Sequence, residues 1–159
     1  MPEHKLILTI CTGNVCRSPM AEKLLQHALE AAGSPLRELV VKSAGVASGY
    51  GDPASENSVA VLRRVNLDLS QHRSQPLTDE LVNQAFAIFG MTESHLEVIR
   101  HYYPNSPKRL HLLRDFLPKS ESKQIPDPFG QDFDAYKACL DSMVEAIPSV
   151  VAYLKSEYK

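Results

Sequence analysis

The sequence contains few cysteines, and their spacing excludes two common uses of that residue. Cys11, Cys16 and Cys139 are an odd and sparse set, which fits a reducing compartment better than a framework of disulfides. Cys11 and Cys16 have four residues between them and no second cysteine pair downstream, so the usual spacing of a structural zinc site is missing. We therefore expect no disulfide framework and no bound metal.

The sequence also lacks a long apolar run and a large excess of either charge. The apolar run at residues 6–10 is too short, and interrupted too soon, for a signal peptide or a membrane span. The formal net charge is -2, which gives no general attraction for nucleic acid. We expect a cytoplasmic protein that binds neither a membrane nor nucleic acid, and any basic site must be local.

Length and periodicity predict a single domain over residues 1–159. The predicted strands are residues 5–10, 39–43, 86–91 and, more weakly, 109–113. The predicted helices are residues 19–32, 55–65, a segment that begins after Thr78, 93–103 and 133–158. This alternation predicts an α/β fold of three layers, in which a four-stranded parallel sheet is flanked by helices.

Two details of the predicted helices depend on single residues. Ser18 is expected to cap the first helix, with Pro19 at its first position. Pro148 should kink or split the last helix, because proline removes one helical hydrogen bond. Ligands of parallel sheets bind outside the carboxyl ends of the strands, so we expect a site at the loop that follows the first strand.

That loop belongs to the segment CTGNVCRSPMAE, residues 11–22. Backbone N–H groups of a loop that enters a helix converge on one point, and the helix dipole adds positive potential there. Arg17 adds a planar charged fork that holds two phosphate oxygens at once. The same field favours the thiolate of Cys11, whose alternative role is that of a small core residue. The predicted phosphate-binding loop comprises Thr12, Gly13, Asn14, Val15, Cys16 and Arg17.

The segment resembles the motif Cys-x-Gly-Asn-x-Cys-Arg-Ser-Pro-x-Ala-Glu of the low-molecular-weight protein tyrosine phosphatases, and it matches that motif without a gap. The resemblance continues through SAGV at Ser43, LSQHRSQPLT around His72, MTESH at Met91 and PDPFG at Pro126, and so covers nearly the whole chain. It implies a four-stranded parallel sheet flanked by helices. It also implies hydrolysis of a phosphorylated protein to inorganic phosphate through a phosphocysteine intermediate, with no cofactor.

The resemblance also implies a general acid. Asp127 lies in an Asp-Pro pair, which by itself is most often a solvated turn. In the family, the matching aspartate protonates the leaving group and later activates water. The neighbouring Pro126 and Pro128 restrict the backbone and could hold the carboxyl group in place. We therefore expect Cys11, Arg17 and Asp127 to carry catalysis.

Further residues are expected to support the loop. Ser18 has a second possible role, as a hydroxyl donor to the Cys11 sulfur. Asn14 suits a left-handed loop conformation, and in the family the matching asparagine is tied to residues that match Ser43 and His72. We expect His72 to shape the loop and not to transfer protons, although without the resemblance an exposed loop histidine would be the simpler interpretation.

The two remaining cysteines are expected to differ in role. Cys16 is either a bystander or a resolving thiol that captures an oxidised Cys11 as a disulfide. Cys139 lies in the pattern of the last helix and is expected in the core. Arsenate reductases of the same fold class use additional cysteines near the middle of the chain, and this sequence has none between Cys16 and Cys139.

The choice of substrate stays open. Tyr50 and Phe129 are candidates for the walls of the substrate pocket, with ordinary loop packing as the alternative. Many family phosphatases carry two tyrosines after the Asp-Pro pair, whereas this chain has DPFG there. This difference, together with CTGN, SAGV and MT, resembles the protein arginine phosphatase branch. That branch has threonine where this chain has Val15, and tyrosine-specific members usually have isoleucine.

Three functions therefore remain under consideration. The leading hypothesis is a phosphotyrosine protein phosphatase, and the alternative with the same chemistry is a protein arginine phosphatase. A hypothesis of another class is an inactive module that binds phosphoproteins or senses redox state. The intact set of Cys11, Arg17 and Asp127 argues against the third hypothesis, because binding alone needs neither a nucleophile nor an acid.

Overall fold

The computed structural model describes residues 4–119 and 121–159. It contains a four-stranded parallel sheet in the order β2-β1-β3-β4. The strands are β1 Leu6–Cys11, β2 Val40–Gly45, β3 Ala85–Gly90 and β4 Leu110–Leu112. The helices are α1 Arg17–Ala32, α2 Glu56–Arg63, α3 Asp79–Gln84, α4 Glu93–Tyr102 and α5 Phe133–Glu157, with a short 3-10 helix, η1, at Leu36–Glu38.

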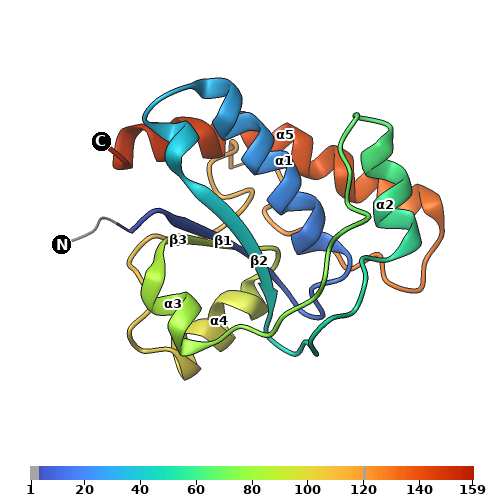
Figure 1. The fold of residues 1–159 in the computed structure, drawn as a ribbon, viewed down its shortest axis with the longest axis horizontal. Helices are drawn as coiled ribbons and strands as arrows, with labels where there is room; N and C mark the ends of the chain where they lie inside the picture. The colour runs from blue at the N-terminus through green and yellow to red at the C-terminus, as the bar shows by residue number, and fades with distance from the viewer. Residues whose placement is uncertain (1–3, 120) are drawn as a thin grey trace.

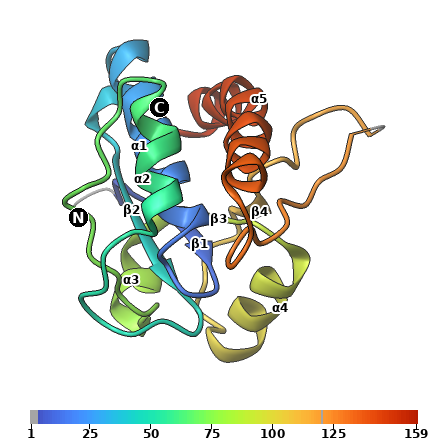
Figure 2. The ribbon, with the colours of Figure 1, turned by 90° about the vertical axis from the view of Figure 1, so that its right-hand side faces the viewer.

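Helices cover both faces of the sheet. The helices α1, α2 and α5 lie on one face, and α3 and α4 lie on the other (Figure 1, Figure 2). Side chains of β1 alternate between the two faces, as expected for an extended strand. Leu8 and Ile10 join the apolar cluster that includes Ile99 of α4, whereas Ile7 joins the cluster formed with α1 and α5. Each face of the sheet therefore buries an apolar cluster, which confirms the predicted three-layer α/β fold.

The predicted elements are present, with ends that differ by one or two residues. The largest consequence is at the start of α1, which begins at Arg17 and has Cys16 at its N-cap position without a capping side chain. Ser18 therefore lies inside the first turn, and its prediction as the N-cap is wrong. The hydroxyl of Ser18 instead contacts Asn14 and Cys11, so it is engaged with the preceding loop.

Pro148 does not split the last helix, contrary to one of the two expectations. The helix α5 runs from Phe133 to Glu157 with Pro148 inside it. Proline leaves the carbonyl four residues earlier without its helical partner. That carbonyl belongs to Val144, a residue that is 45% exposed. Within residues 4–119 and 121–159, no helix has the length and apolar character needed to cross a membrane.

The ends of β1 and β2 position the phosphate-binding loop. Cys11 ends β1 and lies opposite Gly45, which ends β2. The segment after β2 then pairs with the loop, because Val46 N–H donates to the Cys11 carbonyl and Ala47 N–H to the Thr12 carbonyl. A Cβ at Gly45 would lie 2.5 Å from the Thr12 carbonyl oxygen and 2.7 Å from the Ser48 Cβ. The close approach of these two backbone segments therefore requires glycine.

We expect Gly45→Ala to displace the loop and to lower the free energy of unfolding by about 1–3 kcal/mol, the usual effect of overpacking. Urea unfolding followed by circular dichroism measures this change. Gly49→Ala is the matched control, because a Cβ there has ordinary contact, with the nearest atom at 3.5 Å. Equal stability of the two variants would contradict the packing argument.

Candidate active site

Asn14 holds the loop between β1 and α1 in shape. Its φ of 57° is in the left-handed region, which asparagine tolerates better than most residues. Its Nδ2 donates to Ser18 Oγ and Ser43 Oγ, and its Oδ1 accepts from Gln75 N–H, each at 2.9 Å. Its carbonyl accepts from His72 Nε2 at 2.7 Å. The loop is thereby tied to α1, to β2 and to the segment before α3.

His72 lies as the family resemblance implied, against the backbone of the loop. Burial is the main cause that lowers the pKa of His72, so the ring is neutral near pH 7. Because a carbonyl oxygen only accepts, the ring donates through Nε2 to Asn14. This arrangement is compatible with a role in shaping the loop, and that role stays a prediction.

The Cys11 sulfur faces a hydroxyl donor. Cys11 Sγ lies 2.9 Å from Ser18 Oγ, and both residues are buried. Ser18 Oγ already accepts a hydrogen bond from Asn14 Nδ2. When Cys11 is a thiolate, only the Ser18 O–H can donate across this contact. The first turn of α1 therefore places a hydroxyl donor next to the Cys11 sulfur.

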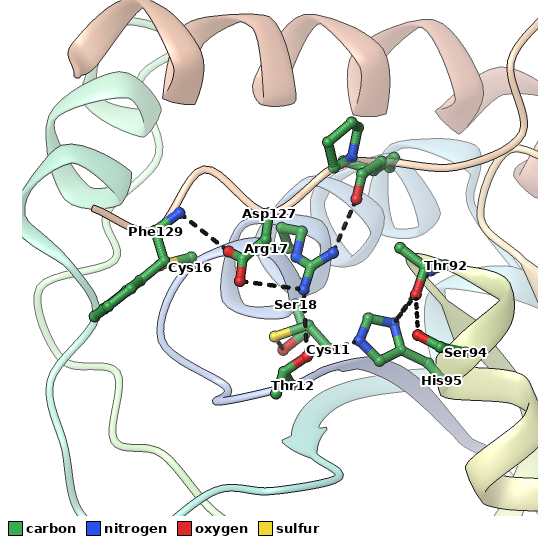
Figure 3. A network of polar contacts seen from close by, with 12 residues as sticks. Cys11, Thr12, Cys16, Arg17, Ser18, Thr92, Ser94, His95, Asp127 and Phe129 are labelled. Carbon is green, nitrogen blue, oxygen red and sulfur yellow. Dashed lines mark hydrogen bonds and ion pairs between the residues drawn. The ribbon is translucent and has the colours of Figure 1, made fainter. Parts of the chain in front are cut away.

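The side chains of Arg17 and Asp127 lie next to each other and form an ion pair (Figure 3). The Arg17 side chain is only 4% exposed, and its Nη1 donates to the Ile125 carbonyl at 2.9 Å. The Asp127 carboxylate is 50% exposed, lies 3.8 Å from Arg17 Nη2, and accepts from Phe129 N–H at 3.0 Å. The cation is therefore fixed before any ligand binds, and the carboxylate stands at the solvent side.

These groups surround a cavity of about 200 Å³. Its lining includes most of the predicted phosphate loop, the expected acid and one of the two aromatic candidates: Cys11, Thr12, Gly13, Val15, Cys16, Arg17, Asp127 and Phe129. Asn14 is fully buried, and its side chain bonds to the surrounding segments. The fold therefore brings together residues of the β1–α1 loop and of the loop before α5, as the sequence predicts for most of them.

Tyr50 is not part of this lining, contrary to the expectation for a pocket wall. Its side chain is 74% exposed. The cause lies in the neighbouring residues, because Gly51 N–H donates to the Ser74 carbonyl and Ser74 Oγ donates to the Gly49 carbonyl. These hydrogen bonds hold the Tyr50 segment against residue 74, and the ring points to solvent.

The other two cysteines are buried. Cys16 Sγ lies 3.4 Å from Tyr136 Oη, and burial is the main cause that raises the pKa of its thiol. Burial likewise raises the pKa of Cys139 to about 12, and this residue belongs to the core as expected. Cys16 shares the cavity with Cys11, and its function as a resolving thiol stays a prediction.

A buried histidine reaches the phosphate loop from α4. His95 is 2% exposed, and its Nε2 lies 3.0 Å from Thr12 Oγ1. Its Nδ1 accepts from Thr92 N–H at 3.1 Å. Burial, with a smaller contribution from the Arg17 guanidinium, lowers the pKa of His95 to about 4. The ring is therefore neutral at physiological pH and carries its hydrogen on Nε2.

Comparison with known proteins agrees with this geometry. The model of the family described as low molecular weight phosphotyrosine protein phosphatase matches residues 6–159. The chain belongs to this family. The family acts on phosphorylated proteins, and its members include both tyrosine and arginine phosphatases. The chain is therefore a phosphatase of this family.

Individual relatives are similar over most of the chain. A protein-arginine-phosphatase from Geobacillus stearothermophilus is 33% identical over 151 residues, which cover 95% of this chain and 97% of the relative. The low molecular weight protein-tyrosine-phosphatase Ptp from Acinetobacter johnsonii is 32% identical over 130 residues, covering 82% and 84% of the two chains. The structure of Vibrio vulnificus Wzb in complex with benzylphosphonate superposes with a TM-score of 0.84 at 29% identity, covering 95% of this chain and 99% of Wzb.

The sequence of this low molecular weight phosphatase does not predict the contact of His95 with the phosphate loop. The segment MTESH carries part of the family resemblance, and the resemblance predicts no role for its histidine. The available signal was a histidine three residues after Thr92, at the start of a predicted helix. His95 and Thr12 are 83 residues apart in sequence, and only the parallel arrangement of β1 and β3 brings their segments together.

The pKa of His95 predicts how stability depends on pH. The folded protein holds the ring neutral down to about pH 4, whereas the unfolded chain takes up the proton near pH 6.5. The contribution of the neutral ring to stability is therefore complete above about pH 6.5 and is lost as the pH decreases toward the folded pKa of about 4. Replacing His95 by Gln removes this contribution, so the loss of stability between about pH 7 and pH 5 should shrink by about 2 kcal/mol.

Urea unfolding of the native protein and of His95→Gln at both pH values tests this. His101→Gln is the control, because His101 is an exposed histidine at the other end of α4. Identical pH profiles for the native protein and His95→Gln would contradict the assigned neutral ring.

Proposed function

We propose that this chain hydrolyses phosphotyrosine in proteins through a phosphocysteine intermediate on Cys11, as one cytoplasmic catalytic domain over residues 1–159. One observation carries the proposal: a buried thiol, a buried guanidinium and a solvent-side carboxylate line one cavity at the carboxyl ends of the strands. A nucleophile, an oxyanion cradle and an acid are the groups that phosphoryl transfer needs. The free thiol of Cys11 suits a reducing compartment.

The reaction has two steps. In the first, the Cys11 thiolate attacks phosphorus, the bond to the leaving oxygen breaks, and protonated Asp127 gives its proton to that oxygen. In the second, the Asp127 carboxylate takes a proton from water, the water oxygen attacks phosphorus, and the phosphorus–sulfur bond breaks, which releases inorganic phosphate and restores the Cys11 thiolate. Arg17 and the backbone N–H groups of the loop hold the phosphoryl oxygens, and the Ser18 hydroxyl stabilises the sulfur as it leaves.

The alternative substrate is phosphoarginine, and two findings support this alternative. The similarity to the arginine phosphatase of Geobacillus stearothermophilus covers nearly the whole chain. Val15 and Phe129 line the cavity, and neither supplies a charged or hydroxyl group that selects one substrate. An inactive binding or redox module is disfavoured, because the cavity combines a nucleophile with an acid.

A test of the acid is the variant Asp127→Asn. We expect its kcat for phenyl phosphate, a poor leaving group, to fall by about 10²- to 10⁴-fold, the usual range for a positioned general acid. The loss should be much smaller for dinitrophenyl phosphate, whose leaving group needs no proton. Steady-state kinetics with both substrates, without added metal, measures the difference. Asp134→Asn, which changes an exposed aspartate of α5, is the control. An equal loss with both substrates would contradict proton donation.

Substitution of Val15 tests how the substrate is chosen. Valine has nearly the shape of threonine without its hydroxyl and is one methylene smaller than isoleucine. A methylene in an apolar pocket discriminates by only about 1–3 kcal/mol, whereas a site built around a hydrogen bond discriminates more strongly. We expect the native protein to favour phosphotyrosine modestly and to retain activity on phosphoarginine. Val15→Thr should shift the ratio toward phosphoarginine, and Val15→Ile toward phosphotyrosine.

The measurement is kcat/KM for a phosphotyrosine and a phosphoarginine peptide of the same sequence in the three proteins. Val59→Thr, a half-buried position on α2 outside the cavity lining, controls for a general effect of a new hydroxyl. A ratio that stays the same in all variants would remove Val15 as the selector and direct attention to Phe129.

A further inference from the structure

The hydroxyl of Thr12 has two hydrogen-bond donors directed at its oxygen. His95 Nε2 lies at 3.0 Å and Arg17 Nη2 at 3.4 Å (Figure 3). Arg17 only donates. His95 also donates here, because the Thr92 N–H occupies its Nδ1 and leaves the ring hydrogen on Nε2. A hydroxyl oxygen accepts two hydrogen bonds, so both acceptor positions of Thr12 Oγ1 are occupied.

The hydrogen of the same hydroxyl is left for an acceptor in the cavity. Thr12 lines that cavity together with Cys11 and Arg17. A phosphoryl dianion offers only acceptor oxygens and would be repelled by a hydroxyl lone pair. The donors on Oγ1 prevent this unfavourable orientation. A hydrogen bond whose direction is set before binding loses less conformational freedom when the anion enters.

We propose that the Thr12 hydroxyl donates a hydrogen bond to a non-bridging oxygen of the bound phosphoryl group, and that His95, a positioning residue on α4, sets the direction of that hydrogen bond. The proposal deepens the proposed function and rests on phosphate binding in the same cavity. Thr12 thus contributes through its side chain and not only through the backbone of the loop. The start of α4 becomes part of the site, although no residue of α4 lines the cavity.

The neutral state of His95 is consistent with this assignment. A second cation beside Arg17 would cost energy, and burial of the ring disfavours its charged form. A protonated ring would also carry a hydrogen on Nδ1, directed at the Thr92 N–H that now donates to it. The ring would then lose the contact that fixes its orientation.

The first experiment compares Thr12→Val with Thr12→Ser. Valine keeps the shape and removes the hydroxyl, whereas serine keeps it. Isothermal titration with inorganic phosphate should show binding weakened by about 10- to 100-fold in Thr12→Val, the range for a hydrogen bond to a charged group. Binding to Thr12→Ser should stay close to native. Native affinity in Thr12→Val would overturn the proposal.

The second experiment tests whether His95 acts through Thr12. His95→Met removes the donor, whereas His95→Gln offers an amide N–H at a similar reach and should restore phosphate binding. The control is His101→Met, at the exposed end of α4. In the double variant Thr12→Val/His95→Met, phosphate binding should be no weaker than in Thr12→Val alone, because the two changes remove one interaction. Additive losses would overturn the positioning role of His95.

The same proteins separate this inference from the proposed function. Turnover of p-nitrophenyl phosphate is measured beside phosphate binding in each variant. A native protein that binds phosphate without turnover, with binding weakened in Thr12→Val, supports the inference and refutes the phosphatase mechanism. Normal native turnover with unchanged phosphate binding in Thr12→Val refutes the inference alone. If His95→Met does not fold, His95→Gln and the Thr12 pair still decide the outcome.

Discussion

The arrangement of the site depends on the side chain of Asn14, which fixes the loop between β1 and α1. An anion cradle needs several N–H groups aimed at one point, and a flexible loop would lose conformational freedom each time it formed one. Asn14 avoids this cost, because its amide and its carbonyl bond to α1, to β2 and to the segment that carries His72. The close approach at Gly45 brings a further strand end against the same loop. The site is therefore a property of the sheet and not of the loop alone.

Two hydroxyl groups in the site share one design. Ser18 Oγ accepts from Asn14, and Thr12 Oγ1 is approached by His95 and Arg17. In each, a neighbouring donor takes up acceptor capacity of the oxygen, so the hydrogen is available to a negative group: the Cys11 thiolate for Ser18 and a phosphoryl oxygen for Thr12. Preorganised donors of this kind stabilise developing charge without rearrangement during the reaction. The buried Arg17 supplies the permanent charge, and the exposed Asp127 keeps access to water.

The sequence was sufficient for features that follow from local patterns, and insufficient for those that depend on distant segments. The apolar run of β1, the glycine exit of α1 and the capping role of Thr78 are local, and the structure contains all three. A serine before a proline is typical of a helix cap, so the local pattern predicts the wrong role for Ser18, whose partners are Cys11 at the end of β1 and Asn14 in the loop. The exposure of Tyr50 depends on Ser74, and the role suggested for His95 depends on Thr12 across the sheet. Periodicity and motif spacing carry no information on such contacts.

The central claim is that Cys11 receives the phosphoryl group. The most direct measurement is rapid acid quenching of Asp127→Asn during turnover of dinitrophenyl phosphate, followed by mass spectrometry of the peptide that contains Cys11. This variant forms the intermediate with a leaving group that needs no proton, and it lacks the base that activates water, so the intermediate should accumulate. We predict a peptide heavier by one phosphoryl group, with the label on Cys11. Turnover with an unmodified Cys11 at every quench time would contradict the account.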